Sequence, residues 1–426
     1  GDRSKAVRSG VVYVGPGKGQ YVLNDTIIYN SSTDSVSISY YRYAPEDTVN
    51  AIYAVTFSFV GEGHGNYKKV TLSQYEFVGI NAGSYAPVRL LPLPQSTMLY
   101  DFDLDANVTD GLRFTGEYVL SNFDANRFSN LDEVETNGSA VKFELNYSQK
   151  DIRIGAMNVG AVDINLRERF IGKRFVTLDR FNEIEFNRKW NIQDSSKVNE
   201  ELREGSMIYT PTPSLILIGG IGSITRGDLF RSNRYTGSLR FHEERIPSAS
   251  YDLEIINSKN FLQDNAGDWV RHRGFVQDTL GHFFPSLRYE GEVLRSRSTA
   301  LDTLRKESFR YHEITPGLAL FDVAKMLFNV EFGFRAEDSL KTGSLQRAST
   351  TFTQQYHWQL RDWHSLSSSL DFTIRNKIFT EQFKHGSGDR LETILLRWQT
   401  RFTPFDKGVE TDLFYEVSSE RSAKLE

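Results

Sequence analysis

The chain has 426 residues, with 50 basic and 55 acidic side chains and a formal net charge of −5. This balance argues against nucleic-acid binding, because no cationic excess is present to neutralise phosphates. The absence of cysteine excludes disulfides, thiolate metal sites and cysteine nucleophiles. No run of about 18 apolar residues occurs, which excludes helical membrane spans but not the alternating strands of a β-barrel.

The first part of the chain carries a repeated glycine-rich pattern, V-G-x-x-x-G-x-Y. Its copies span residues 14–21, 60–67 and 78–85. Glycines at this density suit tight turns with positive φ, and the flanking Val and Tyr residues suit strand ends. A phosphate-binding loop is the weaker alternative, because no helix-forming stretch and no Lys-Ser/Thr pair follows. Residues 1–95 are therefore predicted to form a small, turn-rich β module that ends at the prolines of residues 90–95.

From residue 96 onward the pattern changes to long strands of alternating polarity. Residues 98–108 are apolar at every second position, a Thr-Asp-Gly turn signal follows, and residues 112–121 return with the same alternation. The alternation recurs at residues 141–148, 234–242, 251–255, 287–293, 325–335, 352–361, 366–375, 393–402 and 409–417. We count about 16 such strands, many longer than the roughly 5–6 residues of ordinary globular strands. Residues 299–306 instead predict a short helix within a loop.

Two architectures are consistent with strands that have one apolar and one charged face. A sandwich buries the apolar faces between two sheets, whereas a transmembrane barrel turns them toward lipid. Long strands without crossover helices, and aromatic residues on the apolar face, favour the barrel. We therefore predict an all-β fold in which residues 96–426 form an antiparallel up-and-down transmembrane β-barrel of roughly 16 or more strands. The alternative is a large soluble antiparallel β-sheet or sandwich.

The apolar faces of these strands supply the candidate lipid contacts. Their side chains are large, and the aromatic ones lie near strand ends, as in the aromatic girdles of membrane barrels. The residues predicted to face lipid are Phe102, Phe114, Tyr147, Phe328, Phe332, Trp358, Phe372, Leu396 and Trp398.

Oxygen-bearing side chains crowd the loop that follows residue 123. Asp124, Asn126 and Asp132 are candidate ligands for Ca²⁺, which prefers oxygen donors. The match to an EF-hand loop is partial, since Phe128 occupies a position where an oxygen ligand belongs. The alternative is an Asx-rich surface loop whose side chains cap its own turns. Calcium is the one cofactor that the sequence suggests.

Residues 179–190 mix charges of both signs with a tryptophan. Asp179, Arg180, Glu185 and Arg188 are predicted to form Arg–carboxylate pairs that lock a loop inside the lumen. The alternative is a solvated strand with cross-strand ion pairs. The chain has no H-E-x-x-H motif and no G-x-S-x-G elbow, so we predict no catalytic residues.

Several stretches carry a resemblance to a known group of proteins. They are the repeats at 14–21 and 60–67, and residues 91–95, 117–129 and 169–190. Together they resemble large outer-membrane and cell-surface proteins of the Bacteroidota and Chlorobi group. The resemblance implies a location and a β-barrel architecture but no activity. Residues 415–420 look like a segment that precedes a further glycine-rich turn in such proteins, so we expect a chain truncated before the barrel is complete.

These observations predict a non-enzymatic component of a Gram-negative outer membrane, acting in passage, as a scaffold or in surface assembly. Outer-membrane lipid and other envelope or surface proteins are the expected partners. The alternative is a soluble extracellular adhesin or fibre-like scaffold at the cell surface. An outer-membrane protease or lipase is the third and weakest hypothesis.

Overall fold

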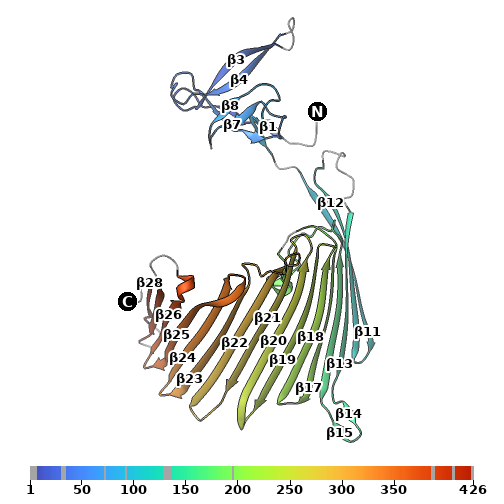
Figure 1. The fold of residues 1–426 in the computed structure, drawn as a ribbon, viewed down its shortest axis with the longest axis vertical. Helices are drawn as coiled ribbons and strands as arrows, with labels where there is room; N and C mark the ends of the chain where they lie inside the picture. The colour runs from blue at the N-terminus through green and yellow to red at the C-terminus, as the bar shows by residue number, and fades with distance from the viewer. Residues whose placement is uncertain are drawn as a thin grey trace. The chain divides into compact units, whose positions relative to one another are not determined.

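The computed structural model describes residues 7–29, 35–71, 73–91, 94–127, 137–193, 196–384, 389–404 and 408–423. The chain divides into two compact units, one formed by Gly1–Met98 and Asn122–Thr136 and the other by Leu99–Ser121 and Asn137–Glu426. β-Strands dominate both units (Figure 1). The sequence-based boundary at residue 95 lies close to the division at Met98.

Short strands in three small sheets make up the first unit. β1 (Val7–Ser9) pairs with β10 (Val88–Leu90). The second sheet has the order β2-β5-β3-β4, formed by β2 (Val11–Tyr13), β5 (Tyr53–Val55), β3 (Tyr21–Tyr29) and β4 (Ser35–Tyr43). The third has the order β6-β9-β7-β8, formed by β6 (Ser58–Phe59), β9 (Tyr85–Ala86), β7 (Tyr67–Lys69) and β8 (Tyr75–Phe77).

The glycine-rich repeats form the turns of this unit, as the sequence predicts. Gly15, Gly61 and Gly79, the first glycine of each copy, have φ values of 87°, 107° and 115°. Glycine adopts such values without the steric cost that a side chain would add. The tyrosine at the end of each copy begins a strand, and Tyr21 and Tyr67 are buried in the aromatic core of the unit.

Burial of Tyr21 gives the first unit a predictable response to alkaline pH. Its hydroxyl donates to the Ser73 carbonyl oxygen and accepts from the Tyr75 N–H, at 3.1 and 3.3 Å. Burial raises the pKa of Tyr21 from 10.0 to about 12. The unfolded chain therefore loses this proton first. The contribution of the protonated Tyr21 hydroxyl to the stability of the folded unit is complete below about pH 10 and is lost as the pH rises through about 12.

Thermal unfolding measured against pH checks this expectation. Tyr21→Phe should reduce the alkaline loss of stability, because the group that ionises is removed. Tyr13→Phe is the matched control, since the Tyr13 ring is 65% exposed. An unchanged alkaline loss in Tyr21→Phe would contradict the assignment.

One antiparallel sheet of sixteen strands forms the second unit. Each strand pairs with the next along the sheet, in the order β11, β12, β13 and then β16 to β28, with β11 and β28 at its two ends. The strands are β11 (Ser96–Thr109), β12 (Leu112–Asp124), β13 (Asn137–Gln149), β16 (Ala161–Ile171), β17 (Glu200–Thr212), β18 (Leu215–Arg226), β19 (Phe230–Glu243), β20 (Ile246–Asn260), β21 (Asn265–Gln277), β22 (Phe283–Ser298), β23 (Phe309–Val323), β24 (Met326–Lys341), β25 (Ser344–Trp363), β26 (Leu366–Phe379), β27 (Arg390–Phe402) and β28 (Thr411–Ala423).

Smaller elements fill the connections of this sheet. β14 (Arg153–Ile154) and β15 (Met157–Asn158) pair in the β13–β16 connection, α1 (Phe186–Trp190) lies between β16 and β17, and the 3₁₀ helix η1 (Glu381–Phe383) follows β26. Two-residue turns join several strands directly. Ala324 and Lys325, between β23 and β24, have φ values of 53° and 59°. Positive φ at both central residues matches the right-handed twist of the strands that the turn joins.

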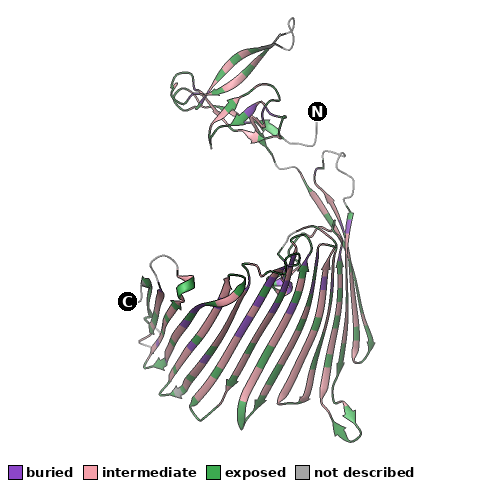
Figure 2. Ribbon diagram, in the orientation of Figure 1, coloured by how far each residue is buried: buried purple, intermediate pink, exposed green. Residues whose placement is uncertain are grey.

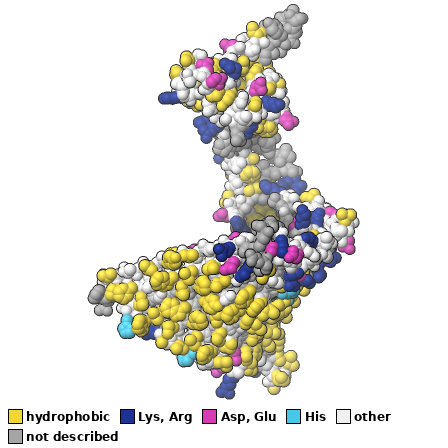
Figure 3. Space-filling view, turned by 60° about the vertical axis from the view of Figure 1, so that its left-hand side comes forward, with side chains coloured by type: hydrophobic (Ala, Val, Ile, Leu, Met, Phe, Trp, Pro, Cys, Tyr) yellow, Lys and Arg dark blue, Asp and Glu magenta, His cyan; other side chains and the backbone are white. Residues whose placement is uncertain are grey.

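The predicted fold class is confirmed, and the two-sheet sandwich is not formed by the described residues. The sixteen strands are 11 to 20 residues long, against the roughly 9–11 needed to cross a bilayer. Within the second unit they form a single layer. Large hydrophobic side chains on one face stay exposed, among them Phe102, Ile221 and Phe334. Exposed and less exposed residues alternate along the strands in Figure 2. Figure 3 shows a broad patch of hydrophobic side chains on the surface of the sheet.

The helix expected at residues 299–306 is absent, and this prediction was wrong. The Asp264 carboxylate, in the β20–β21 turn, accepts hydrogen bonds from the Thr299 hydroxyl and the Ala300 N–H. Leu304 forms a β-bridge with Arg297, so the segment is held in a loop against the neighbouring hairpin. The α-helix of the described residues is α1, in a different connection. No helix in the described part of the chain is long and apolar enough to cross a membrane.

Candidate functional site

Ion pairs gather on one face of the sixteen-stranded sheet, which we call the polar face; the opposite side is the apolar face. Directly paired residues of antiparallel strands point to the same side. Glu254 of β20 faces Arg271 of β21, which in turn faces Glu292 of β22. The Arg271 and Glu254 side chains are 2.7 Å apart and mostly shielded from solvent.

The ion pairs continue on the polar face across most of the sheet. Arg167 of β16 pairs with Glu204 of β17, and Arg273 of β21 lies 2.9 Å from Glu290 of β22. Further along, the Glu337 carboxylate of β24 contacts Arg335 of the same strand and Lys377 of β26. Charges of both signs are interspersed over this face, so these cations lie beside carboxylates.

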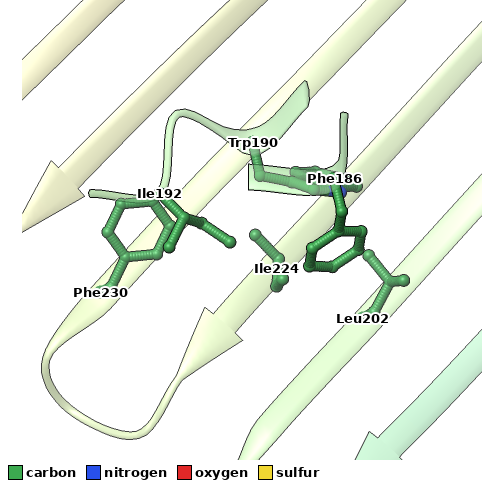
Figure 4. Packing of buried hydrophobic residues seen from close by; sticks show 6 residues of the cluster. All are labelled: Phe186, Trp190, Ile192, Leu202, Ile224 and Phe230. Atoms are coloured by element: carbon green, nitrogen blue, oxygen red, sulfur yellow. The ribbon is translucent and has the colours of Figure 1, made fainter. Parts of the chain in front are cut away.

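The connection between β16 and β17 folds onto this polar face. Trp190 is fully buried, and a Cβ at Gly222 of β18 would lie only 2.6 Å from its Cη2 atom, so glycine is required beneath the indole. The cluster consists of Phe186 and Trp190 of α1, the following Ile192, and Leu202, Ile224 and Phe230 of β17, β18 and β19 (Figure 4). α1 is therefore anchored to the sheet by apolar packing.

Polar contacts fix the orientation of the same connection. The Lys189 ammonium lies 3.1 Å from the Glu204 carboxylate and 2.9 Å from Glu183. Asn191 ends α1 in the left-handed conformation, with φ of 55°, and its side-chain amide donates to the Ser258 hydroxyl of β20 at 2.8 Å. Glu204 thus joins α1 to the ion pairs of the sheet, because it also binds Arg167.

Removing the Glu204 charge should loosen this attachment. Glu204→Gln leaves two partly buried cations without their carboxylate, at an expected cost of about 2 kcal/mol in the free energy of unfolding. Chemical unfolding of the detergent-solubilised protein measures it. Glu201→Gln, three residues away on the more exposed apolar side of β17, is the matched control and should change little. Equal stability of the two variants would contradict the proposed role of Glu204.

A charged hollow lies on the polar face beside α1. Its lining includes Arg188, Asp252, Glu254, Arg271, Arg273, Glu290, Glu292 and Tyr311. Trp269 supports it, since its indole N–H donates to Glu292 at 2.8 Å and the Arg271 guanidinium lies 4.5 Å from the ring centroid. A hollow with both charge signs can hold a polar solute by hydrogen bonds and ion pairs. Among the described residues, no group of three His, Asp or Glu side chains is placed to hold a metal ion.

The predicted lock residues lie in the connection between β16 and β17, but their contacts are mostly local. Arg180 donates to the backbone carbonyls of Asn182, Glu183 and Ile184 rather than to a carboxylate. Arg188 lies 3.6 Å from Glu185 with both side chains more than half exposed, and 6.0 Å from the Trp269 ring centroid. Asp179 is exposed.

Sequence reasoning missed the residues that hold this connection on the sheet. Phe186 and Trp190 are four residues apart, the spacing that places two apolar side chains on one side of a helix. That short signal is hidden in a stretch in which charged residues dominate. The anchoring partners Leu202 and Ile224 lie on strands, and only the fold brings them beneath α1.

Two of the three predicted calcium ligands, Asp124 and Asn126, lie among the described residues. The Asp124 carboxylate accepts the backbone N–H of Asn126 at 2.8 Å, the arrangement of a side chain capping its own turn. Asp132 lies outside the described residues. Calcium binding stays a prediction.

The residues predicted to face lipid come together on the apolar face. Phe328 pairs directly with Trp358, and Phe372 with Leu396. The rings of Phe114 and Phe143 stack at 6.0 Å. The other members, Phe102, Tyr147, Phe332 and Trp398, occupy apolar positions of β11, β13, β24 and β27. Contact of these side chains with lipid stays a prediction.

Comparison with known proteins identifies no family. No protein-family model and no curated protein matches the chain. Among solved structures, the outer membrane protein opdK from Pseudomonas aeruginosa is similar over 76% of this chain and 93% of its own, with 11% sequence identity and a TM-score of 0.29.

Proposed function

We propose that this chain is an outer-membrane β-barrel protein that forms a non-enzymatic, polar-lined passage in a Gram-negative envelope. The connection between β16 and β17 narrows this passage. One observation carries the proposal: a single-layer sheet exposes its large hydrophobic side chains on one face and carries most of its paired charges on the other. In water such a face would drive association, whereas lipid accommodates it.

The polar face supports passage over a purely mechanical role. A lumen that carries polar solutes needs charged and hydrogen-bonding walls, and the ion pairs from Arg167 to Lys377 provide them. α1 covers part of this wall and leaves the hollow lined by Arg188 and Glu254 beside it. The solute that we propose is small and polar and carries both charge signs or neither, because the lining balances cations against carboxylates.

A scaffold or surface-assembly role is the second candidate. The first unit favours it, because this separate compact β module has its own aromatic core, in which the rings of Tyr21 and Phe57 lie 5.4 Å apart. A module of this kind suits contact with another envelope protein. The two roles are compatible in one protein, and conductance separates them.

Fractionation of the envelope, followed by gel mobility of unheated and boiled samples, tests the proposal. We expect a detergent-requiring band in the outer membrane whose mobility changes on boiling, since a folded barrel resists unfolding by detergent alone. The purified protein should then conduct ions in a planar bilayer. A protein that salt or urea releases from the envelope without a mobility change would overturn the barrel. A heat-modifiable protein without conductance would overturn the passage and favour the scaffold.

A further inference from the structure

A collar of charged side chains lies on the apolar face, at the end of the sheet that contains the turn between β18 and β19. Its members are Glu168, Glu201, Arg203, Arg231, Lys259, Asp268, Arg295, Arg297, Arg310, Asp338 and Arg347, which lie near the same ends of β16, β17 and β19 to β25. Further along the same strands, apolar residues such as Ile255, Val270 and Val293 replace them. The collar therefore marks one edge of the apolar band.

On both flanks of the collar the cations are paired with carboxylates of the protein. On one side Arg203 binds Glu168 at 2.9 Å and also contacts Glu201. On the other side the Asp338 carboxylate lies between Arg310 and Arg347, 2.6 Å from the Arg347 guanidinium. These cations have carboxylate partners within the protein.

The middle of the collar is different, because it holds four cations and one acid. Arg231 and Lys259 face each other directly on β19 and β20, an arrangement of like charges that is unfavourable without an anion. Lys259 faces Ala266, which faces Arg297, so three cations follow one row across four strands, about 14 Å wide at the usual strand spacing.

Partners for these cations are few among the described residues. Arg297 approaches the well-exposed Asp302 at 3.8 Å, and within the described part of the chain no salt bridge joins Arg231, Lys259 or Arg295 to a carboxylate. Asp268, the one acid of the group, binds the Asn257 side chain at 3.0 Å. The exposed Phe261 ring lies 5.1 Å from the Lys259 ammonium and 5.9 Å from the Arg231 guanidinium.

We propose that Arg231, Lys259, Arg295 and Arg297 bind the phosphate groups of an anionic lipid. The acyl chains of this lipid would lie against the apolar side chains of β20 to β22, at Ile255, Val270 and Val293. The inference rests on the proposed membrane location. Charge complementarity carries it, since cations clustered at the edge of an apolar band attract anionic head groups. Phe261 fits this position, because aromatic residues flank the apolar band of membrane barrels.

Native mass spectrometry of the full-length protein in detergent tests this site. The probes are phosphatidylglycerol and phosphatidylcholine with identical acyl chains, titrated separately. We expect a preference for phosphatidylglycerol that falls about tenfold in the double variant R231Q/K259Q and similarly in R295Q/R297Q. R203Q removes a collar cation that has carboxylate partners, and it should keep the preference.

The outcomes separate this inference from the proposed function. A protein that inserts and is heat-modifiable, but binds both lipids equally, overturns the lipid site alone. Loss of the preference in R203Q to the same extent as in R231Q/K259Q would also overturn it, because a general charge effect would then suffice. Displacement of the lipid by inorganic phosphate at the same concentration would assign the cations to free phosphate. A protein that never enters the membrane overturns the proposed function first.

Discussion

Trp190→Ala should detach the connection between β16 and β17 from the polar face. The Trp190 side chain is fully buried against Gly222 and the apolar residues of β17 to β19, so its loss leaves a large cavity. Removing a buried tryptophan costs about 3–5 kcal/mol, enough to release a short segment with few other apolar anchors. We expect trypsin to cleave the variant near Arg188 and Lys189 under conditions in which the unmodified protein resists. If the polar face lines a passage, as proposed, single-channel conductance should rise, because the segment no longer covers that face.

Ile184→Ala is the control for this experiment. Ile184 belongs to the same connection but is 82% exposed, so its truncation should alter neither cleavage nor conductance. Gly222→Ala disrupts the same contact from the side of the sheet, since its new Cβ would collide with the Trp190 indole. Unchanged proteolysis in both Trp190→Ala and Gly222→Ala would show that this packing does not hold the connection in place.

Strands and their faces are the part of this fold that the sequence predicts best. The two-residue period of a strand is a local property, so each run can be recognised without knowledge of its partner. Residues 98–108 and 112–121, for example, lie within β11 and β12. Turn residues with positive φ, such as those of the glycine-rich repeats, are equally local.

Contacts between segments far apart in sequence could not be predicted in the same way. α1 has only five residues, too few to stand out as a helix by periodicity, and tertiary packing of Trp190 stabilises it. Residues 299–306 show the opposite error. Their local pattern suits a helix, but the carboxylate of Asp264, far away in sequence, holds them in a loop. The cluster of cations in the collar also emerges only when the register places Arg231 opposite Lys259.

Leu396→Arg should impair membrane insertion, whereas Leu395→Arg should not. The two leucines are neighbours on β27, and the register places Leu396 beside Phe372 on the apolar face and Leu395 beside Thr373 on the polar face. An arginine on the lipid side of a barrel costs about 2–4 kcal/mol at the bilayer midplane, whereas the charged polar face accepts it. The fraction of heat-modifiable protein after refolding into lipid vesicles measures the difference.

This pair of variants separates a membrane barrel from a soluble sheet because residue type, strand and length of side chain are held constant. If water covered both faces, an arginine at Leu396 would replace an apolar contact with Phe372 by a solvated charge. Vesicle insertion would not occur for either variant. Equal insertion of both variants would contradict the lipid assignment of the apolar face. A selective defect in Leu396→Arg would assign the apolar face to lipid at single-residue resolution, and it would place the ion pairs of Arg397 and its neighbours in the lumen.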